Sequence, residues 1–230
     1  RSDTLVALGG GVVGDLTGFA AATFLRGIDF IQLPTTLLAA VDASVGGKAA
    51  IDLKNGKNLA GAFYQPRLVL CDLDTLDTLP DDIFSDGCAE VIKTAILFDE
   101  PLFMELVRSG LNFDREAVIT RSIDWKRQVV MEDEFDTGVR QLLNLGHTFG
   151  HAAEALSDFT LSHGKAVAIG TAMAARIAVR TGHCDQGTAT RIMWLLEKFG
   201  LPIFTHHSAE ALANAALSDK KRAGDTVKLI

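Results

Sequence analysis

A strand signal that runs directly into three glycines and then into a helix signal constrains the fold of this chain most. Residues 4–8 are mainly apolar, residues 9–11 are glycines, and residues 12–24 have the apolar spacing of a helix. Glycine lets backbone amides approach an anion, and the first turn of a helix offers unpaired N–H groups and a favourable dipole. The pattern is typical of a phosphate-binding turn, and equally of a tight turn without a ligand. Its spacing departs from G-x-G-x-x-G, so it names no dinucleotide by itself.

Two further apolar runs, residues 29–33 and residues 68–71, have the length and composition of strands. Strands that are joined by helical crossovers indicate parallel pairing in an α/β layer. Between the two runs, residues 44–58 are rich in glycine and polar side chains, which predicts a hairpin or an extended functional loop.

The pattern changes after Leu79 and Pro80. Apolar positions from residue 81 to residue 217 recur at helical spacing, and glycines mark the expected helix ends. We therefore predict an α/β first domain, residues 1–79, followed by an all-α second domain, residues 80–230.

The composition narrows the class of protein. The net charge of −7 argues against a general affinity for nucleic acid. Three scattered cysteines are too few for a disulfide framework or a thiolate metal site, and they fit a reducing setting. The longest apolar stretch, residues 166–175, contains a glycine and is too short to span a membrane. We therefore expect a cytoplasmic protein that binds neither nucleic acid nor a membrane.

Three of the six histidines lie close together in the sequence, at His147, His151 and His163. The first two are four residues apart, so they share one face of a helix. Neutral imidazole is a common ligand of transition metals, and a third ligand would complete an open catalytic site. Upstream, Glu90 and Lys93 place a carboxylate and an ammonium on one helical face, and Glu90 is a candidate third ligand. A lone buried histidine is usually a hydrogen-bonded core residue, but this cluster favours a metal site.

Several basic side chains could bind an anion in this acidic chain. Arg140 precedes Asn144 and His147 by four and seven residues, so all three could share a helical face. That arrangement suits an anionic substrate held against a metal. Taken alone, each basic residue is more often a solvated surface charge. The candidates are Lys48, Lys57, Lys93, Lys126, Arg26 and Arg140.

Taken in order, these residues closely resemble the 3-dehydroquinate synthase family of sugar phosphate cyclases. The resemblance covers nearly the whole chain and is strongest over residues 9–15, 33–36, 42–58, 89–93, 140–151 and 163–165. It implies a Rossmann-like NAD-binding α/β domain, of which residues 1–79 are the C-terminal part. Residues 80–230 would form the helical metal- and substrate-binding domain, with the active site between the two domains.

The resemblance also implies roles for individual residues. The metal, zinc by preference with cobalt as the alternative, would be bound by Glu90, His147 and His163. NAD would contact Gly10, Gly11, Val12, Val13, Gly14, Asp15, Thr35, Thr36, Asp42, Lys48, Lys57, Thr75, Leu76, Asp77 and Thr78. The catalytic residues would be Lys48, Lys93, Lys126, Arg140, Asn144 and His151. Further substrate contacts would be Arg26, Asp42 and Asn58.

Two of these implied roles change the view that spacing alone gives. His151 would face the substrate, which replaces the pairing of His147 with His151 as metal ligands. Arg26 matches an arginine that reaches a phosphate in the neighbouring subunit, which implies a homodimer. Residues 219–221 resemble a C-terminal lysine motif of the family, with either Lys220 or Lys221 as the substrate contact.

The implied reaction is that of a lyase in the shikimate pathway, which leads to chorismate and the aromatic amino acids. It converts 3-deoxy-D-arabino-heptulosonate 7-phosphate, a small phosphorylated sugar acid, into 3-dehydroquinate and phosphate. Two other enzymes stay open: another sugar phosphate cyclase such as 2-deoxy-scyllo-inosose synthase, and a glycerol dehydrogenase-like metal-dependent oxidoreductase. Because the family has a further segment before the position of Arg1, we interpret the chain as a fragment, and a non-catalytic fragment is the third alternative.

Overall fold

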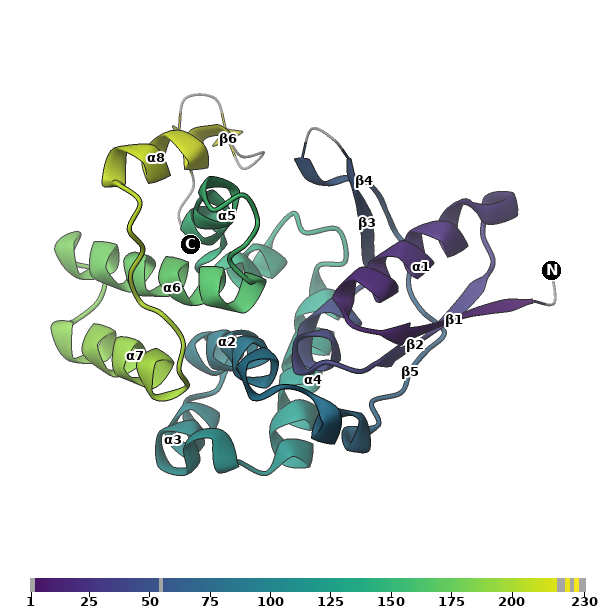
Figure 1. Cartoon of the computed structure of the whole chain (residues 1–230), viewed down its shortest axis with the longest axis horizontal. Helices are drawn as coiled ribbons and strands as arrows, with labels where there is room; N and C mark the ends of the chain where they lie inside the picture. Colours follow the sequence, from purple (N-terminus) through teal and green to yellow (C-terminus); the bar gives the residue numbers. More distant parts are fainter. Residues whose placement is uncertain (1–2, 54–55, 219–221, 224–225, 228–230) are drawn as a thin grey trace. The chain divides into compact units, whose positions relative to one another are not determined.

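The computed structural model of the chain forms two compact units (Figure 1). The structure describes residues 3–53, 56–218, 222–223 and 226–227. The first unit comprises Arg1–Gly87 and Asp114–Thr137, and the second comprises Cys88–Phe113 and Gly138–Ile230. The predicted C-terminal substrate contact at Lys220 or Lys221 lies outside the described residues.

A parallel sheet organises the first unit. Its strands, in the order β1-β2-β5, are β1 (Thr4–Gly9), β2 (Asp29–Pro34) and β5 (Leu68–Val69). The first two strands pair in register along their whole length, from Thr4 with Asp29 to Gly9 with Pro34. The predicted α/β layer with parallel strands is therefore confirmed.

Helix α1 (Gly11–Thr23) connects the first two strands and packs on the sheet (Figure 1). Its buried face consists of small residues, because the helix approaches its neighbours closely. A Cβ atom on Gly18 would lie 2.8 Å from the Cβ of Ala49 and 3.3 Å from the ring of Phe30. Ala49 belongs to an antiparallel hairpin, β3 (Lys48–Leu53) and β4 (Gly56–Phe63), that also packs against α1. Of the two structures predicted for residues 44–58, the hairpin is the one observed.

The remaining elements of the first unit are short helices and one long helix. They are η1 (Phe24–Arg26), the π-helical turn η2 (Ala39–Ala43), η3 (Leu73–Thr78), α4 (Arg115–Glu132) and the first turns of α2 (Asp81–Phe98). Helix α4 packs against η2, and its Arg115 forms an ion pair with Asp77 of η3 at 2.6 Å.

The second unit is built mainly from helices. After the C-terminal part of α2 come α3 (Glu100–Ser109), η4 (Gly110–Asn112), η5 (Val139–Asn144), α5 (His147–Leu156), α6 (His163–Arg180), α7 (Gln186–Lys198) and α8 (Ala209–Ser218). Its core includes Leu102, Leu106 and Phe199, each fully buried, and Phe113 stacks on Phe199 with ring centroids 6.3 Å apart. A two-residue antiparallel pair, β6 (Arg222–Ala223) with β7 (Thr226–Val227), adds a strand element that the prediction of an all-α region did not include.

The compact units and the predicted domains divide the chain differently. Helix α2 begins at Asp81, just after the predicted boundary, but the division between the two units falls inside it, after Gly87. Helix α4 groups with the first unit although it lies in the predicted helical domain. The division into domains 1–79 and 80–230 stays a prediction. No helix in the described part of the chain is long and apolar enough to cross a membrane.

Candidate active site

Three side chains of the second unit converge on one point. Glu90 lies on α2, whereas His147 and His163 are the first residues of α5 and α6. The Oε1 atom of Glu90 lies 3.6 Å from Nε2 of His147 and 3.3 Å from Nε2 of His163. Two helix N-termini, each the positive end of a helix dipole, thus face a carboxylate that is 1% exposed. The structure brings together the three residues that the resemblance implied as metal ligands.

The backbone explains why the two histidines meet. Gly146 has φ of 79°, a left-handed conformation that glycine adopts without strain, and it turns the chain into α5 directly before His147. Helices α5 and α6 then cross at glycines. A Cβ atom on Gly150 would lie 2.9 Å from the carbonyl oxygen of Ala166, and one on Gly170 would overlap the carbonyl oxygen of Gly146. The close crossing is therefore possible because these positions lack side chains.

Each histidine ring is oriented through its second nitrogen. The Nδ1 atom of His147 lies 3.1 Å from the carbonyl oxygen of Leu145. The Nδ1 atom of His163 lies 3.7 Å from Oε1 of Glu154, a carboxylate on α5 that is 2% exposed. Both rings therefore direct Nε2 at Glu90.

The charges in this cluster are strongly coupled. Burial opposes ionisation of Glu90, but the ammonium of Lys93 and the neighbouring imidazole of His163 outweigh it and hold the pKa of Glu90 well below its usual range. Burial and the charge of Lys93 lower the pKa of His147 well below its usual range, so this ring is neutral at pH 7. Burial also opposes a charge on His163, but Glu154 and Glu90 together raise its pKa to about 10.

The unsatisfied buried carboxylate of this cluster fits a metal ion. Among the described residues, Oε1 of Glu90 is buried without a hydrogen-bond donor. A buried carboxylate oxygen without a donor is costly unless a cation pairs with it. Lys93 forms an ion pair with the other oxygen, Oε2, and Oε1 is the atom that faces the two imidazoles. One carboxylate and two imidazoles form a ligand set typical of catalytic zinc sites.

His151 lies beside this group but belongs to a different one. Its ring centroid is 5.3 Å from that of His147 and 6.3 Å from that of His163. A second set of three possible ligand atoms comes from His151, Glu154 and His163. Helical spacing suggests that His147 and His151 bind a metal together. The pair that meets at Glu90 is His147 with His163.

Arg140 and Asn144 do not share a helical face with His147, so that prediction from spacing was wrong. They lie in the 3₁₀ helix η5, which ends at Asn144, and the left-handed Gly146 separates η5 from α5. Arg140 is 2% exposed, and Asn144 donates from Nδ2 to the carbonyl oxygen of Gln141 at 3.1 Å. A buried guanidinium is a strong site for an anion, because it is already desolvated.

In the first unit, the predicted cofactor residues of the glycine turn, together with Thr35 and Thr36, lie at the carboxyl ends of β1 and β2. Gly10 precedes α1, and the amide of Thr35 donates to the carbonyl oxygen of Gly9 at 2.9 Å, which joins the loops after the two strands. A Cβ atom on Gly10 would lie 3.2 Å from Cγ2 of Thr36. Within the described residues, the amides of Gly11 and Val12 at the start of α1 have no acceptor. This turn can therefore hold an anion such as a cofactor phosphate.

A second group in the first unit centres on Lys126 of α4. Its Nζ atom contacts both the backbone oxygen and Oδ1 of Asp42, which lies in η2. Asp15 on α1 interacts electrostatically with both Lys126 and Asp42. Its burial and the nearby charge of Asp52 raise its pKa to about 6, although Lys126 opposes this shift. Lys48 has another partner, because it forms an ion pair with Asp136 at 2.5 Å.

The other predicted residues of the first unit lie on η1, β4, η3 and the first turn of α1. Arg26 is exposed in η1, beyond the far end of α1, about 20 Å along the helix axis from Gly10. Lys57 and Asn58 are exposed at the start of β4. Of the η3 segment, Thr75 is partly exposed and Thr78 exposed, whereas the side chain of Leu76 is 3% exposed, so this residue would offer a ligand its backbone. Val12, Val13 and Gly14 belong to the first turn of α1, where Val12 is 82% exposed.

Glu154 is the main residue that sequence reasoning missed. It follows His147 and His151 by seven and three residues, so all three share one face of α5. That spacing is the signal that could have identified it.

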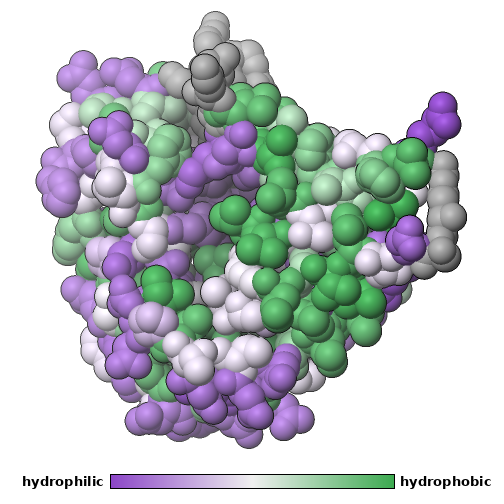
Figure 2. Space-filling model, turned by 45° about the vertical axis from the view of Figure 1, so that its right-hand side comes forward, coloured by the Kyte–Doolittle hydropathy of each residue, from purple (hydrophilic) through white to green (hydrophobic). Residues whose placement is uncertain are grey.

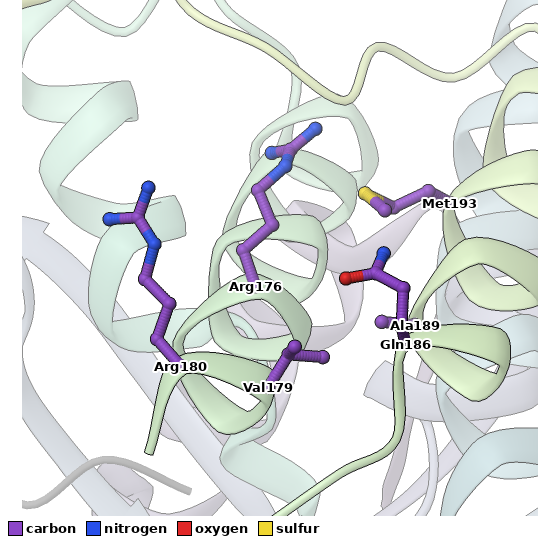
Figure 3. A pocket seen from close by; sticks show the side chains of 6 residues that line it. All are labelled: Arg176, Val179, Arg180, Gln186, Ala189 and Met193. Atoms are coloured by element: carbon purple, nitrogen blue, oxygen red, sulfur yellow. The ribbon is translucent and has the colours of Figure 1, made fainter. Parts of the chain in front are cut away.

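A separate cavity of about 220 Å³ lies between α6 and α7 (Figure 3). Arg176 and Arg180 line it on the α6 side, and Gln186, Ala189 and Met193 on the α7 side. Arg176 donates to the carbonyl oxygen of Ile203 at 2.9 Å and lies over the ring of Phe204. None of the predicted site residues lines this cavity.

Comparison with known proteins identifies the family. A model described as 3-dehydroquinate synthase N-terminal matches residues 1–86, and one described as 3-dehydroquinate synthase C-terminal matches residues 87–222. The chain belongs to the 3-dehydroquinate synthase family. The 3-dehydroquinate synthase of Pelobacter propionicus is 52% identical over 238 residues, which cover 100% of this chain and 66% of that relative. The chain therefore spans about two thirds of the length of this relative.

Solved structures of related cyclases share the fold. The 2-epi-5-epi-valiolone synthase from Streptomyces hygroscopicus, solved with NAD+ and Zn2+, matches 94% of this chain and 62% of its own length, with a TM-score of 0.86 and 26% identity. A 2-deoxy-scyllo-inosose synthase, solved with carbaglucose-6-phosphate, NAD+ and Co2+, matches 96% of this chain and 62% of its own length, with a TM-score of 0.84 and 32% identity. The dehydroquinate synthase-like fold is thus confirmed.

Proposed function

We propose that this chain is the larger part of a 3-dehydroquinate synthase. The enzyme would convert 3-deoxy-D-arabino-heptulosonate 7-phosphate, a small phosphorylated sugar acid, into 3-dehydroquinate and phosphate in the shikimate pathway. The observation that carries this proposal is the convergence of Oε1 of Glu90 with the Nε2 atoms of His147 and His163, in a chain of this family.

Glu90, His147 and His163 would hold a divalent metal ion, which when bound would polarise a hydroxyl or carbonyl oxygen of the substrate. Glu90 is ionised and His147 is neutral, which are the forms that bind a metal. His163 carries a proton in the metal-free protein, so an ion has to displace it. We favour zinc, with cobalt as the alternative, because related cyclases were solved with Zn2+ or Co2+.

The turn before α1 would bind a phosphate of NAD. Bound NAD would accept a hydride and return it, so that the reaction is redox-neutral overall. The unpaired amides of Gly11 and Val12 would donate to the phosphate. Gly10 keeps the turn open beside Thr36. Asp15, Lys57 and the η3 segment Thr75–Thr78 would complete the cofactor contacts of the first unit, as the resemblance implies.

The charged side chains would bind the anionic groups of the substrate and move its protons. In the second unit, Arg140 would pair with a carboxylate or phosphate, Asn144 would donate an amide hydrogen, and His151 would pass a proton as a general acid or base. In the first unit, Lys126 would be held in place by Asp42, and Lys48 would exchange Asp136 for an anion of the substrate or cofactor. Lys93 would hold Glu90 ionised.

The identities favour 3-dehydroquinate synthase over the alternatives. The relative of that name is 52% identical, whereas the two cyclases with other names are 26% and 32% identical. A solved glycerol dehydrogenase has a TM-score of 0.66 at 18% identity, which supports the shared fold alone. We further propose a homodimer, because exposed Arg26 matches the arginine that reaches a neighbouring subunit. We also propose that the protein is cytoplasmic.

Phosphate release from 3-deoxy-D-arabino-heptulosonate 7-phosphate, with NAD and zinc present, tests the proposal. The assay is run on this chain, on the longer protein of which we expect it to be part, and on a His163→Ala variant of each. Release that needs both additions, leaves no net NADH and disappears in the variants is the expected result.

Two other results would contradict the proposal. Net NADH production from a simple alcohol would favour the dehydrogenase. Turnover of glucose 6-phosphate in place of the sugar acid would favour a different cyclase. Activity in the longer protein without activity in this chain would identify the chain as a non-catalytic fragment of the synthase.

A further inference from the structure

Glu154 is a buried carboxylate that the proposed metal-ligand set does not use. It lies on α5, two turns after His147, and is 2% exposed. A buried carboxylate is destabilising unless charges or donors compensate for it. Its recorded ion-pair partner is the imidazole of His163, whose Nδ1 atom lies 3.7 Å from Oε1 of Glu154. That separation is within the range of an ion pair but longer than a hydrogen bond, so the carboxylate lies next to Nδ1 without a short contact to it.

The ring of His163 therefore lies between two carboxylates. Its Nε2 atom faces Oε1 of Glu90 at 3.3 Å, and its Nδ1 atom faces Glu154. A histidine that binds a metal through one nitrogen commonly donates the N–H of the other to a carboxylate or a carbonyl oxygen, which fixes the tautomer and the ring orientation. The position of Glu154 matches that second partner.

His147 offers an internal comparison. Its Nδ1 atom has the carbonyl oxygen of Leu145 as partner at 3.1 Å, so the backbone orients this ring. Within the described residues, the ring of His163 has no carbonyl partner of this kind, and a carboxylate faces each of its two nitrogens. The two rings present the same nitrogen to Glu90, but a side chain takes the place of the backbone for His163.

We propose that Glu154 is a positioning residue, whose carboxylate holds the Nδ1–H group of His163 and so keeps Nε2 directed at the metal. The inference rests on the metal role of His163 in the proposed function. Glu154 itself touches neither the metal nor the substrate. The rival arrangement is an ion bound by His151, Glu154 and His163, whose ligand atoms also lie near one another.

Zinc affinity measured by competition with a chromophoric chelator tests the proposal without any substrate. The matched pair of variants is Glu154→Gln, which keeps an acceptor oxygen, and Glu154→Met, which has a similar length and no strong acceptor. We expect Glu154→Gln to bind zinc within a few-fold of the original chain, and Glu154→Met to bind about 10–100-fold more weakly. Circular dichroism melting verifies that both variants fold. His163→Ala marks the loss expected from removing a ligand.

His151→Ala separates the two arrangements. If Glu154 only positions His163, zinc affinity stays unchanged in this variant. A loss in His151→Ala as large as that in Glu154→Met would place the ion in the rival group and overturn the proposal. Equal affinities for Glu154→Met and the original chain would overturn it as well.

Nuclear magnetic resonance of 15N-labelled histidine gives a readout that needs no Glu154 variant. In the zinc-loaded chain, His163 is expected to be protonated at Nδ1 and metal-bound at Nε2, and the opposite tautomer would refute the inference. Failure of the original chain to bind zinc would overturn both the metal centre and this inference. Zinc binding without phosphate release, even in the longer protein, would refute the proposed function and leave the role of Glu154 intact.

Discussion

In the second unit a carboxylate, two imidazoles and an ammonium are buried together, whereas the first unit leaves apolar side chains of its sheet in solvent. Glu90 and Lys93 are 1% and 2% exposed, but Val6 and Leu8 of β1 are 56% and 64% exposed. Apolar side chains gather on the surface of the first unit (Figure 2). Buried charges are tolerated in the second unit because their partners lie within the same unit. The exposed apolar side chains of the first unit are typical of a surface that contacts another part of a protein.

The candidate sites differ in the same way. All three proposed metal ligands come from the second unit, and their geometry is set by side chains and by helix crossings. The glycine turn of the first unit would bind its ligand through backbone amides, and any phosphate group can accept hydrogen bonds from these amides. We therefore expect metal binding to be a property of the second unit and to be sensitive to single side chains. The two tryptophans allow each unit to be followed alone, because Trp125 lies in the first and Trp194 in the second.

The largest effect is expected from Glu90→Ala. The variant removes a ligand and the carboxylate that pairs with the buried ammonium of Lys93, so the unfolding free energy of the second unit should fall by about 3–5 kcal/mol. Urea unfolding followed by Trp194 fluorescence in a Trp125→Phe background measures it. Zinc binding should be lost.

The double variant Glu90→Leu with Lys93→Met is the control. It removes both charges and keeps the volume, so it should recover most of the stability but no zinc binding. If the double variant were as unstable as Glu90→Ala, packing and not the loss of the ion pair would explain the lower stability.

Gly170→Ala should have the next largest effect. Its Cβ atom would overlap the backbone oxygen of Gly146, so α5 and α6 have to separate. We expect a loss of about 2–3 kcal/mol from overpacking, together with weaker zinc binding, since the helices carry His147 and His163. Gly187→Ala on α7 is the matched control, because its Cβ atom would approach a side-chain oxygen of Asp185 at 3.0 Å, and its effect should stay below about 1 kcal/mol. Equal losses for both would contradict the role of the crossing.

Asp15→Asn should alter the pH dependence of the first unit. Burial and the charge of Asp52 raise the folded-state pKa of Asp15 from its ordinary value of 3.8 to about 6. The folded state then binds a proton more tightly than the unfolded state, so the stability from this group is present below pH 3.8 and lost as the pH rises to about 6. Asparagine should remove this loss and stabilise the first unit by about 1–2 kcal/mol at pH 8, allowing for solvent screening.

Trp125 fluorescence in a Trp194→Phe background measures the effect of Asp15→Asn. The gain should stay nearly constant from pH 8 down to about pH 6, shrink below that pH and be absent near pH 4. A gain that stays the same at all pH values would refute the electrostatic explanation.

The smallest change in stability, within about 0.5 kcal/mol, is expected from Leu8→Ser, because this side chain is already exposed. The variant should instead reduce the binding of the dye 8-anilinonaphthalene-1-sulfonate to the folded chain. Leu111→Ser, at an apolar position of the second unit that is 44% exposed, is the control and should leave dye binding unchanged. A drop in both variants would mean that the two units expose similar apolar surfaces, contrary to the comparison.

Local patterns were enough to predict much of this fold. The parallel strands β1 and β2, helix α1 between them, and the helical second half follow from periodicity and from the glycines at residues 9–11, because these signals involve neighbours in the sequence. The hairpin of residues 44–58 was one of two predicted structures. The family and its implied ligand set also followed from the sequence, through motifs that occur in order along the chain.

The sequence by itself determined which residues could bind a metal and which segment could bind a phosphate, because side-chain chemistry and glycine content need no fold. The tertiary structure decided how close these residues come to one another, and it brings His147 and His163 to Glu90, as the resemblance implied. It placed Arg140 in η5 and not on the helix of His147, because the left-handed Gly146 ends one helix before the next begins. It also brought Glu154 to His163, two residues on different helices that meet where glycines let α5 and α6 cross. Contacts of this kind depend on the packing of distant segments, which spacing along the chain does not encode.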